Sequence, residues 1–317
     1  MEILKLNPVF KDYIWGGTRL ASDYGFDTGF EKTAEGWMLA CHRDGMNTVD
    51  GGEYDGKRFD EVINAVGLEK LAGKNCLKFP YFPVLIKLID AYDNLSVQVH
   101  PDDDYARRVE NEYGKTECWY VLDALDSAEL IYGFKEKLTA DEFKEAIESN
   151  TLLDKLNRVK VKKGDFFFIE ASTVHAIGRG ALIAEIQQNS NCTYRVYDYG
   201  RIGKDGKPRE LHIEKALDVS VCEPPKYDIK PFGEEEQRKG HIFQILCEGE
   251  LFSVYRYKVS ESVKLITDAK SFNHILVLEG EGKINSLKAK KGDSFFVPAS
   301  FGEYEISGNI ELLVTKI

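Results

Sequence analysis

Long apolar runs and basic stripes are both missing from this sequence. No segment approaches the roughly 18 consecutive apolar residues that a membrane-spanning helix needs. The 53 Asp and Glu residues outnumber the 42 Lys and Arg residues, which gives a formal net charge of −11. A nucleic-acid-binding protein is expected to show the opposite balance or a local basic stripe. These absences argue against a membrane protein and against nucleic acid as a partner.

Cysteine pairs of the CxxC type and a P-loop are also absent. The six cysteines are scattered along the 317 residues, and the opening MEILKLNPVF lacks the basic and then apolar run of a signal peptide. We therefore expect free thiols, a reducing compartment and a cytoplasmic location. The pattern GxxxxGK[ST] does not occur, so any phosphate must be bound by cations placed in another way.

Short apolar runs broken by Gly, Asp or Asn fill most of the chain and are typical of β-strands. Three examples are residues 82–89, 95–100 and 118–122. Helical signals are confined to islands at about residues 57–71, 101–113 and 139–157. The last island opens with the capping box Thr139-Ala140-Asp141-Glu142. The sequence therefore predicts a mostly-β protein with helical insertions.

Residues 223–240 have the composition of a linker. Two prolines at 224 and 225 and a third at 231 precede an acidic stretch with few apolar residues. This linker predicts one domain over residues 1–235, which carries the helical insertions, and a second module over residues 236–317.

An internal repeat relates the two predicted parts of the chain. Residues 162–172 (KKGDFFFIEAS) resemble residues 290–300 (KKGDSFFVPAS), so the chain uses one β-module twice. A Gly-Asp turn, an apolar strand, a short loop and a His are how a small antiparallel barrel presents a ligand inward. Continuing the alignment places Glu303 at the position of His175, and pairing residues 119–122 with residues 275–278 places Asn273 at that of Glu117. Only the first copy keeps both potential metal ligands.

Polar side chains mark the ends of three apolar strands in the first module. In residues 97–100 (VQVH), strand alternation sends Gln98 and His100 to the same face. Glu117 begins the next apolar run, and His175 follows the Gly-Asp turn. Imidazole and carboxylate ligands without a thiolate suit a catalytic Zn²⁺, and Mn²⁺, Fe²⁺ or Co²⁺ fit the same ligand types. We therefore predict one divalent metal per chain, Zn²⁺ before the others, held by Gln98, His100, Glu117 and His175.

Four motifs surround these residues. They are QVHP (98–101), KTECWY (115–120), VHAIG (174–178) and the long EIQQNSNCTYRVYDY (185–199). Together with YIWGG (13–17) and AEGW (34–37), they resemble the type I mannose-6-phosphate isomerases. The likeness extends through the C-terminal module and therefore covers essentially the whole chain, which looks like the compact bacterial branch of the family.

The resemblance implies a fold and a reaction. The fold is two cupin-type, jelly-roll β-barrel modules with helical insertions, the first catalytic and the second without metal ligands. The reaction is a zinc-dependent interconversion of mannose 6-phosphate and fructose 6-phosphate through an enediol intermediate. The sugar phosphate is then the expected partner, and we expect a monomer. The family's four metal ligands carry over to the four residues named above, and its active-site arginine to Arg195.

An aldose–ketose isomerisation moves a proton between C1 and C2, so the site needs a base and a group that stabilises an oxyanion. Arg195 has a fixed positive charge that can hold an enediolate or sugar oxygen. Glu185 is a candidate base, and Lys115, two residues before a metal ligand, is a second catalytic candidate. Arg201 and Lys204 follow the long motif and are the candidates for binding phosphate.

The residues alone leave two other functions open. His, Glu and His ligands also suit Fe²⁺, as in a cupin metal oxygenase. A non-catalytic sugar-binding cupin would keep the metal for structure. The polar neighbourhood of Arg195, Lys115 and Glu185 favours an enzyme, because a structural metal does not require it.

Overall fold

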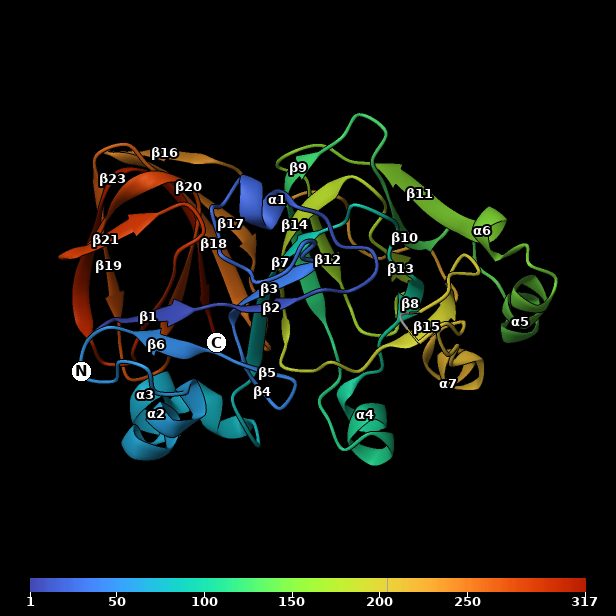
Figure 1. Ribbon diagram of the computed structural model, residues 1–317, viewed down its shortest axis with the longest axis horizontal. Helices are drawn as coiled ribbons and strands as arrows, with labels where there is room; N and C mark the ends of the chain where they lie inside the picture. The colour runs from blue at the N-terminus through green and yellow to red at the C-terminus, as the bar shows by residue number, and fades with distance from the viewer. Residues whose placement is uncertain (204) are drawn as a thin grey trace. The chain divides into compact units, whose positions relative to one another are not determined.

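A computed structural model describes residues 1–203 and 205–317. The chain forms two compact units. Unit 1 contains Met1–Val9, Trp37–Ile86 and Lys230–Ile317, and unit 2 contains Phe10–Gly36 and Lys87–Ile229. Both units are built mainly from strands, which confirms the predicted mostly-β fold (Figure 1). Lys204, a predicted phosphate ligand, lies outside the described residues. Within the described ranges, every helix is too short or too polar to span a bilayer.

The two units are not separated by one cut in the chain. The sequence predicted a division near residue 235, but the structure groups Met1–Val9 and Trp37–Ile86 with the C-terminal residues. The reason is strand pairing. Strand β1 (Leu4–Asn7) lies between β22 (Ser294–Val297) and β6 (Thr48–Asp50) and is antiparallel to both.

Unit 1 contains a ten-stranded sheet in the order β16-β17-β18-β23-β20-β22-β1-β6, with β19 paired to β23 and β21 paired to β20. Its other strands are β16 (Glu236–Arg238), β17 (His241–Cys247), β18 (Ser253–Val259), β19 (Ser262–Thr267), β20 (Asn273–Ile284), β21 (Leu287–Lys290) and β23 (Gly302–Lys316). A small hairpin of β4 (Cys41–His42) and β5 (Gly45–Met46) also belongs to unit 1. The sheet encloses an apolar core that includes Val277, Phe295 and Leu312.

The first predicted helical island, residues 57–71, forms two helices rather than one. Helix α2 (Phe59–Val66) and helix α3 (Leu68–Ala72) are separated by Gly67, and the 3-10 helix η1 (Lys74–Lys78) follows. Gly67 has a φ of 91°, a conformation that breaks an α-helix and that glycine adopts most easily.

Unit 2 is organised around two sheets. The five-stranded sheet has the order β11-β10-β13-β8-β15, and the six-stranded sheet has the order β12-β9-β14-β7-β3-β2. Strands β2, β3 and β7 carry the chain from one unit to the other. The bounds are β2 (Val9–Lys11), β3 (Glu35–Leu39), β7 (Val84–Asp90), β8 (Val97–Val99), β9 (Glu117–Ala124), β10 (Glu129–Phe134), β11 (Leu156–Lys160), β12 (Phe166–Ile169), β13 (His175–Ala176), β14 (Ala181–Gln188) and β15 (Tyr194–Tyr197).

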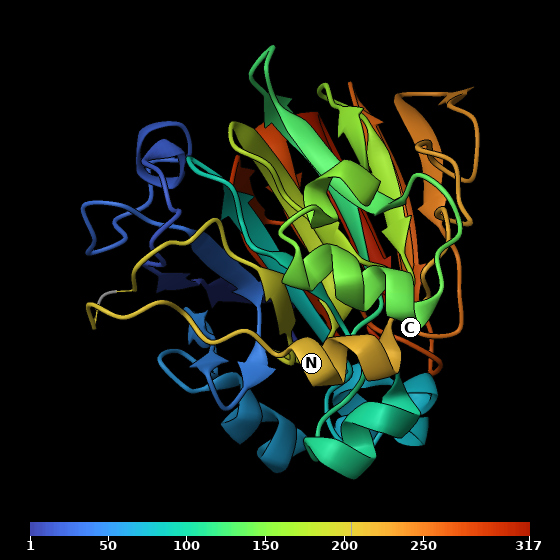
Figure 2. The same ribbon diagram turned by 90° about the vertical axis from the view of Figure 1, so that its right-hand side faces the viewer.

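Helices cover one face of the five-stranded sheet. They are α5 (Ala140–Glu148), α6 (Leu152–Lys155) and α7 (Ile213–Val219), and Figure 2 looks directly onto them. Phe143 of α5 and Ala216 of α7 share an apolar cluster with Val97 and Val99 of β8. Because side chains alternate along a strand, Gln98 points to the opposite face of the sheet. The predicted polar wall therefore faces away from the helices.

Two helix starts agree with the sequence. The capping box of α5 forms, because Thr139 Oγ1 accepts a hydrogen bond from the Glu142 amide at 3.2 Å and Glu142 Oε2 accepts one from the Thr139 amide at 2.7 Å. Helix α4 (Asp103–Val109) is capped by Asp102, whose Oδ1 accepts a hydrogen bond from the Tyr105 amide at 2.8 Å. The remaining helix is the short α1 (Arg19–Ser22).

The predicted internal repeat is present in the structure, where the same hydrogen-bonded turn precedes an equivalent strand in both copies. Before β12, Asp165 Oδ2 accepts a hydrogen bond from the Lys162 amide at 2.9 Å. Before β22, Asp293 Oδ2 accepts the same bond from the Lys290 amide at 2.9 Å. Strand β12 pairs with β9 and strand β22 pairs with β20, both antiparallel. The two segments are therefore the same supersecondary unit.

Candidate metal centre and active site

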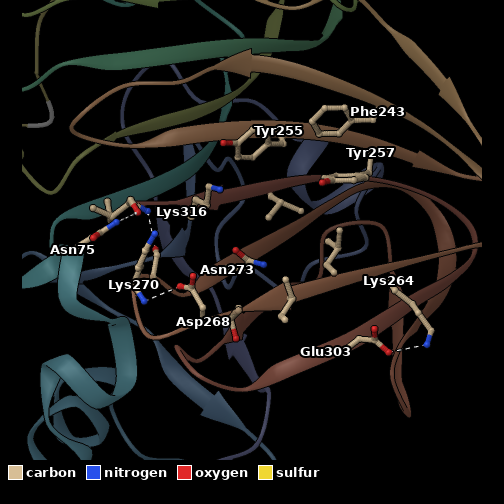
Figure 3. A pocket seen from close by; sticks show the side chains of 16 residues that line it. Asn75, Phe243, Tyr255, Tyr257, Lys264, Asp268, Lys270, Asn273, Glu303 and Lys316 are labelled. Carbon is tan, nitrogen blue, oxygen red and sulfur yellow. Dashed lines mark hydrogen bonds and ion pairs between the residues drawn. The ribbon is translucent and has the colours of Figure 1, made fainter.

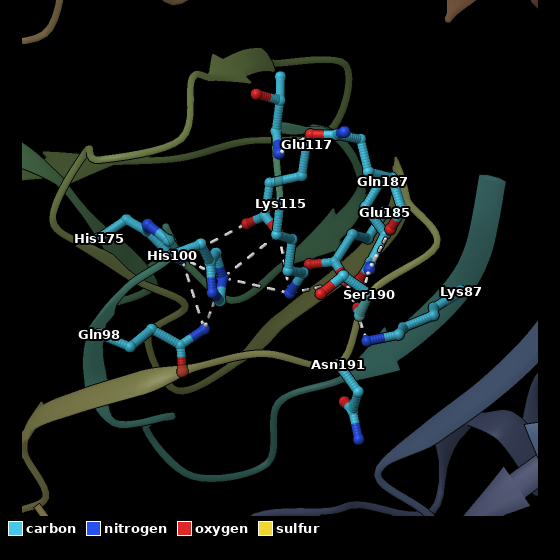
Figure 4. Close-up of polar contacts among 12 residues, drawn as sticks. Lys87, Gln98, His100, Lys115, Glu117, His175, Glu185, Gln187, Ser190 and Asn191 are labelled. Carbon is cyan, nitrogen blue, oxygen red and sulfur yellow. Dashed lines mark hydrogen bonds and ion pairs between the residues drawn. The ribbon is translucent and has the colours of Figure 1, made fainter. Parts of the chain in front are cut away.

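Three of the predicted metal ligands meet inside unit 2. His100 directly follows β8, Glu117 begins β9 and His175 begins β13. Each is at most 1% exposed. His175 Nε2 lies 3.1 Å from His100 Nε2 and 3.4 Å from Glu117 Oε1, and His100 Nε2 lies 3.5 Å from Glu117 Oε2. Figure 4 shows the three side chains converging from their separate strands.

This arrangement fits a divalent metal. Ligands at 2.0–2.2 Å around a tetrahedral Zn²⁺ stand roughly 3.3–3.5 Å from one another, close to the three distances measured here. Both carboxylate oxygens of Glu117 are buried, and the Lys115 ammonium lies beside them, with its Nζ 3.0 Å from Oε2. The other oxygen, Oε1, has no hydrogen-bond donor among the described residues, and a buried carboxylate oxygen without a donor is costly. The three residues form a group that could hold a metal ion.

The orientation of both imidazoles also suits a metal. The Nδ1 of His100 lies 2.9 Å from the carbonyl oxygen of Cys192, and the Nδ1 of His175 lies 2.8 Å from that of Thr173. Each Nδ1 therefore carries the hydrogen, and each Nε2 offers its lone pair to the centre. Burial lowers the pKa of both rings, that of His175 to about 4. Both histidines are neutral at pH 7, the state that binds metal.

Gln98, the fourth predicted ligand, reaches the same centre. It is directly opposite His175 in the pairing of β8 and β13. Its Nε2 lies 3.5 Å from His100 Nε2 and 3.4 Å from His175 Nε2, while its Oε1 accepts a hydrogen bond from Ser96 Oγ at 3.2 Å. Turning the amide over would present its oxygen to the centre, and the Ser96 hydroxyl can accept from the amide nitrogen instead.

Two lysines and a second glutamate lie next to the centre. Lys115 Nζ is 3.0 Å from Glu117 Oε2, 3.2 Å from His100 Nε2 and 3.9 Å from Glu185 Oε1. Lys87 Nζ is 3.2 Å from the same Glu185 oxygen. Lys87, Lys115 and Glu185 are all buried, so these contacts are screened little by water. Figure 4 shows the two ammonium groups approaching Glu185 from different elements.

The two buried acids differ in charge state. Burial raises the pKa of Glu117 to about 7, and the neighbouring Glu185 adds to the rise. Burial alone would raise the pKa of Glu185 as well, but Lys115 and Lys87 outweigh it and hold that pKa below its usual range. Trp119 Nε1 donates a further hydrogen bond to Glu185 Oε2 at 3.0 Å. Glu185 is therefore ionised. Glu117 is the acid whose ionised form a nearby metal would stabilise most.

Lys87 is itself held by two carboxylates. Its second partner is Glu35, whose Oε2 lies 3.5 Å from Lys87 Nζ. Burial alone would lower the pKa of Lys87, but Glu35 and Glu185 together outweigh it and raise the pKa. The ammonium therefore stays charged and fixes Glu185 in place.

A cavity of about 230 Å³ gives access to these groups. Four of the predicted site residues line it, namely Gln98, Lys115, Glu185 and Arg195. Lys87, Glu35 and Arg209 line it too, together with Tyr13 and Trp15 among others. The lysines and Glu185 are buried whereas Arg195 and Arg209 are half-buried, so the cavity has a buried end and a more open, cationic end.

Arg195 connects the two ends. It lies on β15 directly opposite Gln98 of β8. Its Nη1 donates a hydrogen bond to the carbonyl oxygen of Glu210 at 2.7 Å, while its buried Nε donates to no acceptor in the described chain. Burial lowers the pKa of Arg195, and the positive charge of Arg209 lowers it further. The guanidinium remains charged and has a free donor for an anionic oxygen.

Arg201, a predicted phosphate ligand, is bound elsewhere. Its Nη2 pairs with Asp198 Oδ1 at 2.5 Å and its Nη1 donates to the carbonyl oxygen of Asn94. It is not among the described residues that line the cavity. Arg209 lines it beside Arg195, and its Nε donates to Asp198 Oδ2 at 2.7 Å. Arg209 was not predicted as a site residue.

Lys87 and Glu35 were also missed, and one of them had a signal in the sequence. Lys87 interrupts the apolar run of residues 82–89. A lysine inside a buried strand is rare unless a charged group pairs with it, so this position pointed to a nearby carboxylate. Glu35 and Arg209 lie in segments without a comparable pattern, and only the fold brings them to the cavity.

Comparison with known proteins identifies the family. The catalytic domain of type I phosphomannose isomerase matches residues 3–132, and the mannose-6-phosphate isomerase cupin domain matches residues 243–317. The mannose-6-phosphate isomerase ManA of Bacillus subtilis is 42% identical over 321 residues, which cover 100% of this chain and 99% of that protein. This chain belongs to the type I mannose-6-phosphate isomerase family.

Solved structures of the family support the fold. The crystal structure of the mannose 6-phosphate isomerase from Bacillus subtilis covers 100% of both chains at 38% identity, with a TM-score of 0.90. A mannose 6-phosphate isomerase from Salmonella typhimurium bound with zinc and yttrium shares the fold, with a TM-score of 0.76 at 18% identity over 99% of each chain. The cupin fold implied by the sequence is therefore confirmed. Of the three functions left open by the residues, family membership favours the isomerase.

Proposed function

We propose that this member of the family interconverts mannose 6-phosphate and fructose 6-phosphate through an enediol, with one divalent metal bound by Gln98, His100, Glu117 and His175. The observation that carries the proposal is the spacing of the three buried ligand atoms around the Glu117 carboxylate, whose Oε1 has no hydrogen-bond donor among the described residues. The cavity beside them holds an ionised acid and several cations, as a proton transfer on an anionic sugar requires.

Zn²⁺ is the metal that the donor set fits best. Two imidazoles, one carboxylate and an amide oxygen match its preference for nitrogen and oxygen ligands in a catalytic site, and no thiolate is present among the four residues. When bound, the metal supplies Lewis-acid stabilisation of negative charge on a sugar oxygen. All other steps below belong to side chains of this chain.

The charges along the cavity orient the substrate. The phosphate sits at the half-buried end with Arg209, because a guanidinium binds phosphate oxygens well. The opposite end of a hexose 6-phosphate carries C1 and C2, which then reach the buried end beside Lys115 and Glu185. The substrate is long enough to use both ends of the cavity, and its charge matches the cationic end.

Glu185 is the base of the proposed reaction. It is ionised, lines the cavity and is fixed by Lys87 and by the indole of Trp119. Its carboxylate takes the proton from C2 of mannose 6-phosphate and returns it to C1, which leaves the ketose. A carboxylate held by fixed donors keeps its position between the two carbons, which lie on neighbouring atoms of the substrate.

Lys115 and Arg195 handle the oxygens. The Lys115 ammonium lies 3.9 Å from the Glu185 carboxylate, so it can donate to the sugar oxygens O1 and O2 and support the hydroxyl proton as it moves from O2 to O1. The buried Nε of Arg195, which lacks an acceptor among the described residues, donates to a sugar oxygen while negative charge develops. A preorganised charged donor in a buried site is an effective stabiliser of such charge.

One assay tests the proposal. Zinc-loaded protein is mixed with mannose 6-phosphate and fructose 6-phosphate is measured, before chelation, after chelation and after zinc is restored. We expect conversion that is lost and then recovered. In D₂O part of the product should carry deuterium at C1, because the proton that Glu185 takes from C2 can exchange with solvent before it is returned. Absence of conversion refutes the isomerase, and equal conversion after chelation refutes the metal.

A pair of variants tests the base. Glu185→Gln should retain zinc and lose nearly all turnover. Glu170→Gln is the matched control, because Glu170 is a surface acid that pairs with Lys226. Equal activity of the two variants would remove Glu185 from the mechanism.

A further inference from the structure

A second cavity, of about 720 Å³, opens into the sheet of unit 1 and has no part in the proposed reaction. Its volume lies within the roughly 300–1,000 Å³ of small-molecule sites. It is lined by residues of β17, β18, β19, β20 and β23 together with Asn75 of η1. Figure 3 shows these side chains pointing into one hollow. The question is what this hollow binds.

The cavity of unit 1 occupies the place that the metal ligands occupy in unit 2. In unit 2, Glu117 pairs with the last residue of β12, and in unit 1 Asn273 pairs with the last residue of β22. Asn273 is therefore the counterpart of Glu117. The same spacing makes Glu303, next to the start of β23, the counterpart of His175, as the sequence repeat indicated. Both counterparts line the cavity.

Strand register gives the other two counterparts. In unit 2 His175 is directly opposite Gln98, and in unit 1 Glu303 is directly opposite Ile266. Ile266 therefore stands at the position of Gln98, and Asp268, two residues further, at that of the first histidine ligand. Ile266 and Asp268 also line the cavity. The second barrel has kept all four positions and replaced every side chain.

The replacements do not form a metal site. Glu303 Oε1 pairs with Lys264 Nζ at 2.7 Å, and Asp268 Oδ1 accepts a hydrogen bond from the Lys270 amide at 2.7 Å. Among the described residues, the group of acids, histidines and cysteines close enough to hold an ion is the one in unit 2. The cavity therefore calls for a ligand that binds without a metal.

One wall of the cavity is aromatic. The rings of Phe243 and Tyr255 are stacked at 20° with centroids 5.9 Å apart, and the ring of Tyr257 lies 5.2 Å from that of Phe243. In Figure 3 the three rings follow one side of the hollow, and Asn273 faces them. Three rings on one side offer an apolar surface, with the ring of Tyr257 tilted by 53° to that of Phe243. The wall suits the carbon-bound hydrogens of a sugar ring.

Polar groups that can still form hydrogen bonds or ion pairs surround the aromatic wall. Asn273 is buried, its Nδ2 donates to the Tyr304 hydroxyl at 2.8 Å, and its carbonyl oxygen accepts no hydrogen bond from the described residues. The ammonium groups of Lys270 and Lys316 make no ion pair with a described carboxylate side chain. Lys316 Nζ lies 4.8 Å from the centroid of the Tyr255 ring. An amide thus faces the wall, and unpaired positive charge flanks it.

We propose that the cavity of unit 1 is a metal-free binding site for a phosphorylated monosaccharide. The sugar ring packs against the aromatic wall beside Lys316, whose ammonium lies over the Tyr255 ring; a hydroxyl donates to the Asn273 oxygen, and the phosphate is held by Lys270 and Lys316. Lysine is a common phosphate ligand because it is a compact point charge. The inference goes beyond the proposed function and does not depend on it, since none of these residues belongs to the metal centre.

Binding stoichiometry tests the site on the zinc-loaded full chain. Equilibrium dialysis with radiolabelled fructose 6-phosphate should show a second binding event per chain beyond the one at the metal centre. The double variant Lys270→Ala/Lys316→Ala should lose it or weaken it at least tenfold. Lys258→Ala/Lys283→Ala is the matched control, because both lysines are exposed on the same sheet and lie outside the cavity lining. The control should bind as the unmodified protein does.

Several results would overturn the proposal. The first is a single binding event in the unmodified protein. The second is a second binding event that the double variant retains. The third is radiolabelled fructose 6-phosphate that fructose or AMP displaces from the second site as well as unlabelled fructose 6-phosphate does. An unchanged thermal unfolding midpoint shows that the double variant is folded. If the midpoint shifts, each single variant is measured instead, and the proposal is wrong if neither single variant binds fructose 6-phosphate more weakly than the unmodified protein does. Arg195→Ala should keep the second event. A protein without isomerase turnover but with lysine-dependent binding would refute the proposed function alone.

Discussion

Removing the Lys87 ammonium should destabilise unit 2 strongly and in a pH-dependent way. Lys87 is 3% exposed and lies between Glu185 at 3.2 Å and Glu35 at 3.5 Å. Methionine has a similar length and no charge, so Lys87→Met leaves two buried carboxylates without their shared cation. Breaking a buried ion pair from one side costs about 3–5 kcal/mol, a large part of the 5–15 kcal/mol that stabilises a typical domain.

The sign of the pH dependence follows from Glu185. Without Lys87, one of the two ammonium groups that hold its pKa down is gone while its burial remains, so the folded-state pKa of Glu185 rises. A carboxyl whose pKa is higher in the folded state than in the unfolded state does not lower the free energy of unfolding when the pH is below its unfolded pKa. The loss of free energy grows as the pH rises through the folded pKa. The loss of stability should therefore be small near pH 4 and complete near neutral pH.

Urea unfolding of the chelated proteins, followed by tryptophan fluorescence between about pH 4 and pH 8, measures this loss. Lys226→Met is the matched control, because Lys226 pairs with Glu170 at 3.1 Å on the surface, and it should leave the transition unchanged. A loss below about 1 kcal/mol, or an equal loss at both ends of the pH range, would refute the reasoning from buried charge.

Three further predictions concern the metal ligands, the base and the metal-free protein. His175→Ala should lose metal and activity together, whereas Arg195→Ala should keep its metal and lose about 10²–10³-fold in kcat/KM. Metal analysis beside steady-state kinetics distinguishes the two variants. A metal-depleted Arg195 variant would contradict the role given to that residue. Trp119→Phe removes the donor to Glu185, a hydrogen bond to a charged group worth about 1.5–3 kcal/mol. The pKa of Glu185 should rise and the acidic limb of the kcat/KM profile should move to higher pH; an unmoved limb would speak against Glu185 as the base. Because the folded-state pKa of Glu117 is raised from 4.5 to about 7, the contribution of this group to the stability of the metal-free protein should be most favourable below the unfolded pKa and should fall as the pH rises toward 7. Saturating Zn²⁺ should reverse that trend, since the metal binds the deprotonated carboxylate, and a flat profile in urea titrations without metal would count against the raised pKa.

Local patterns predicted the strands and the convergence of His100, Glu117 and His175. The alternation in residues 97–100 placed Gln98 and His100 on one face, and the structure shows Val97 and Val99 packed on the other. The repeated Gly-Asp turn predicted the common position of His175 and Glu303. These inferences succeeded because each depends on a few neighbouring residues whose geometry is fixed by strand periodicity or by turn chemistry.

Features that depend on distant parts of the chain were not predicted. The phosphate candidates were taken from residues that follow the long motif, yet Arg201 lies outside the cavity lining, whereas Arg209, which also pairs with Asp198, lines the cavity. The assignment of Met1–Val9 to unit 1 depends on the pairing of β1 with β22. Neither outcome has a local sequence signature, because both arise from contacts between segments far apart in the chain.

Unit 1 is built from segments made before and after most of unit 2, and this has a consequence for synthesis on the ribosome. Strand β1 is made before every residue of unit 2, but its partner β22 is made after all of them. Unit 2 can therefore fold while β1 and β6 still have exposed backbone edges, which are sites for wrong pairing between chains. A translational pause late in the message would lengthen the time during which these edges are unpaired and would favour aggregation of the nascent protein.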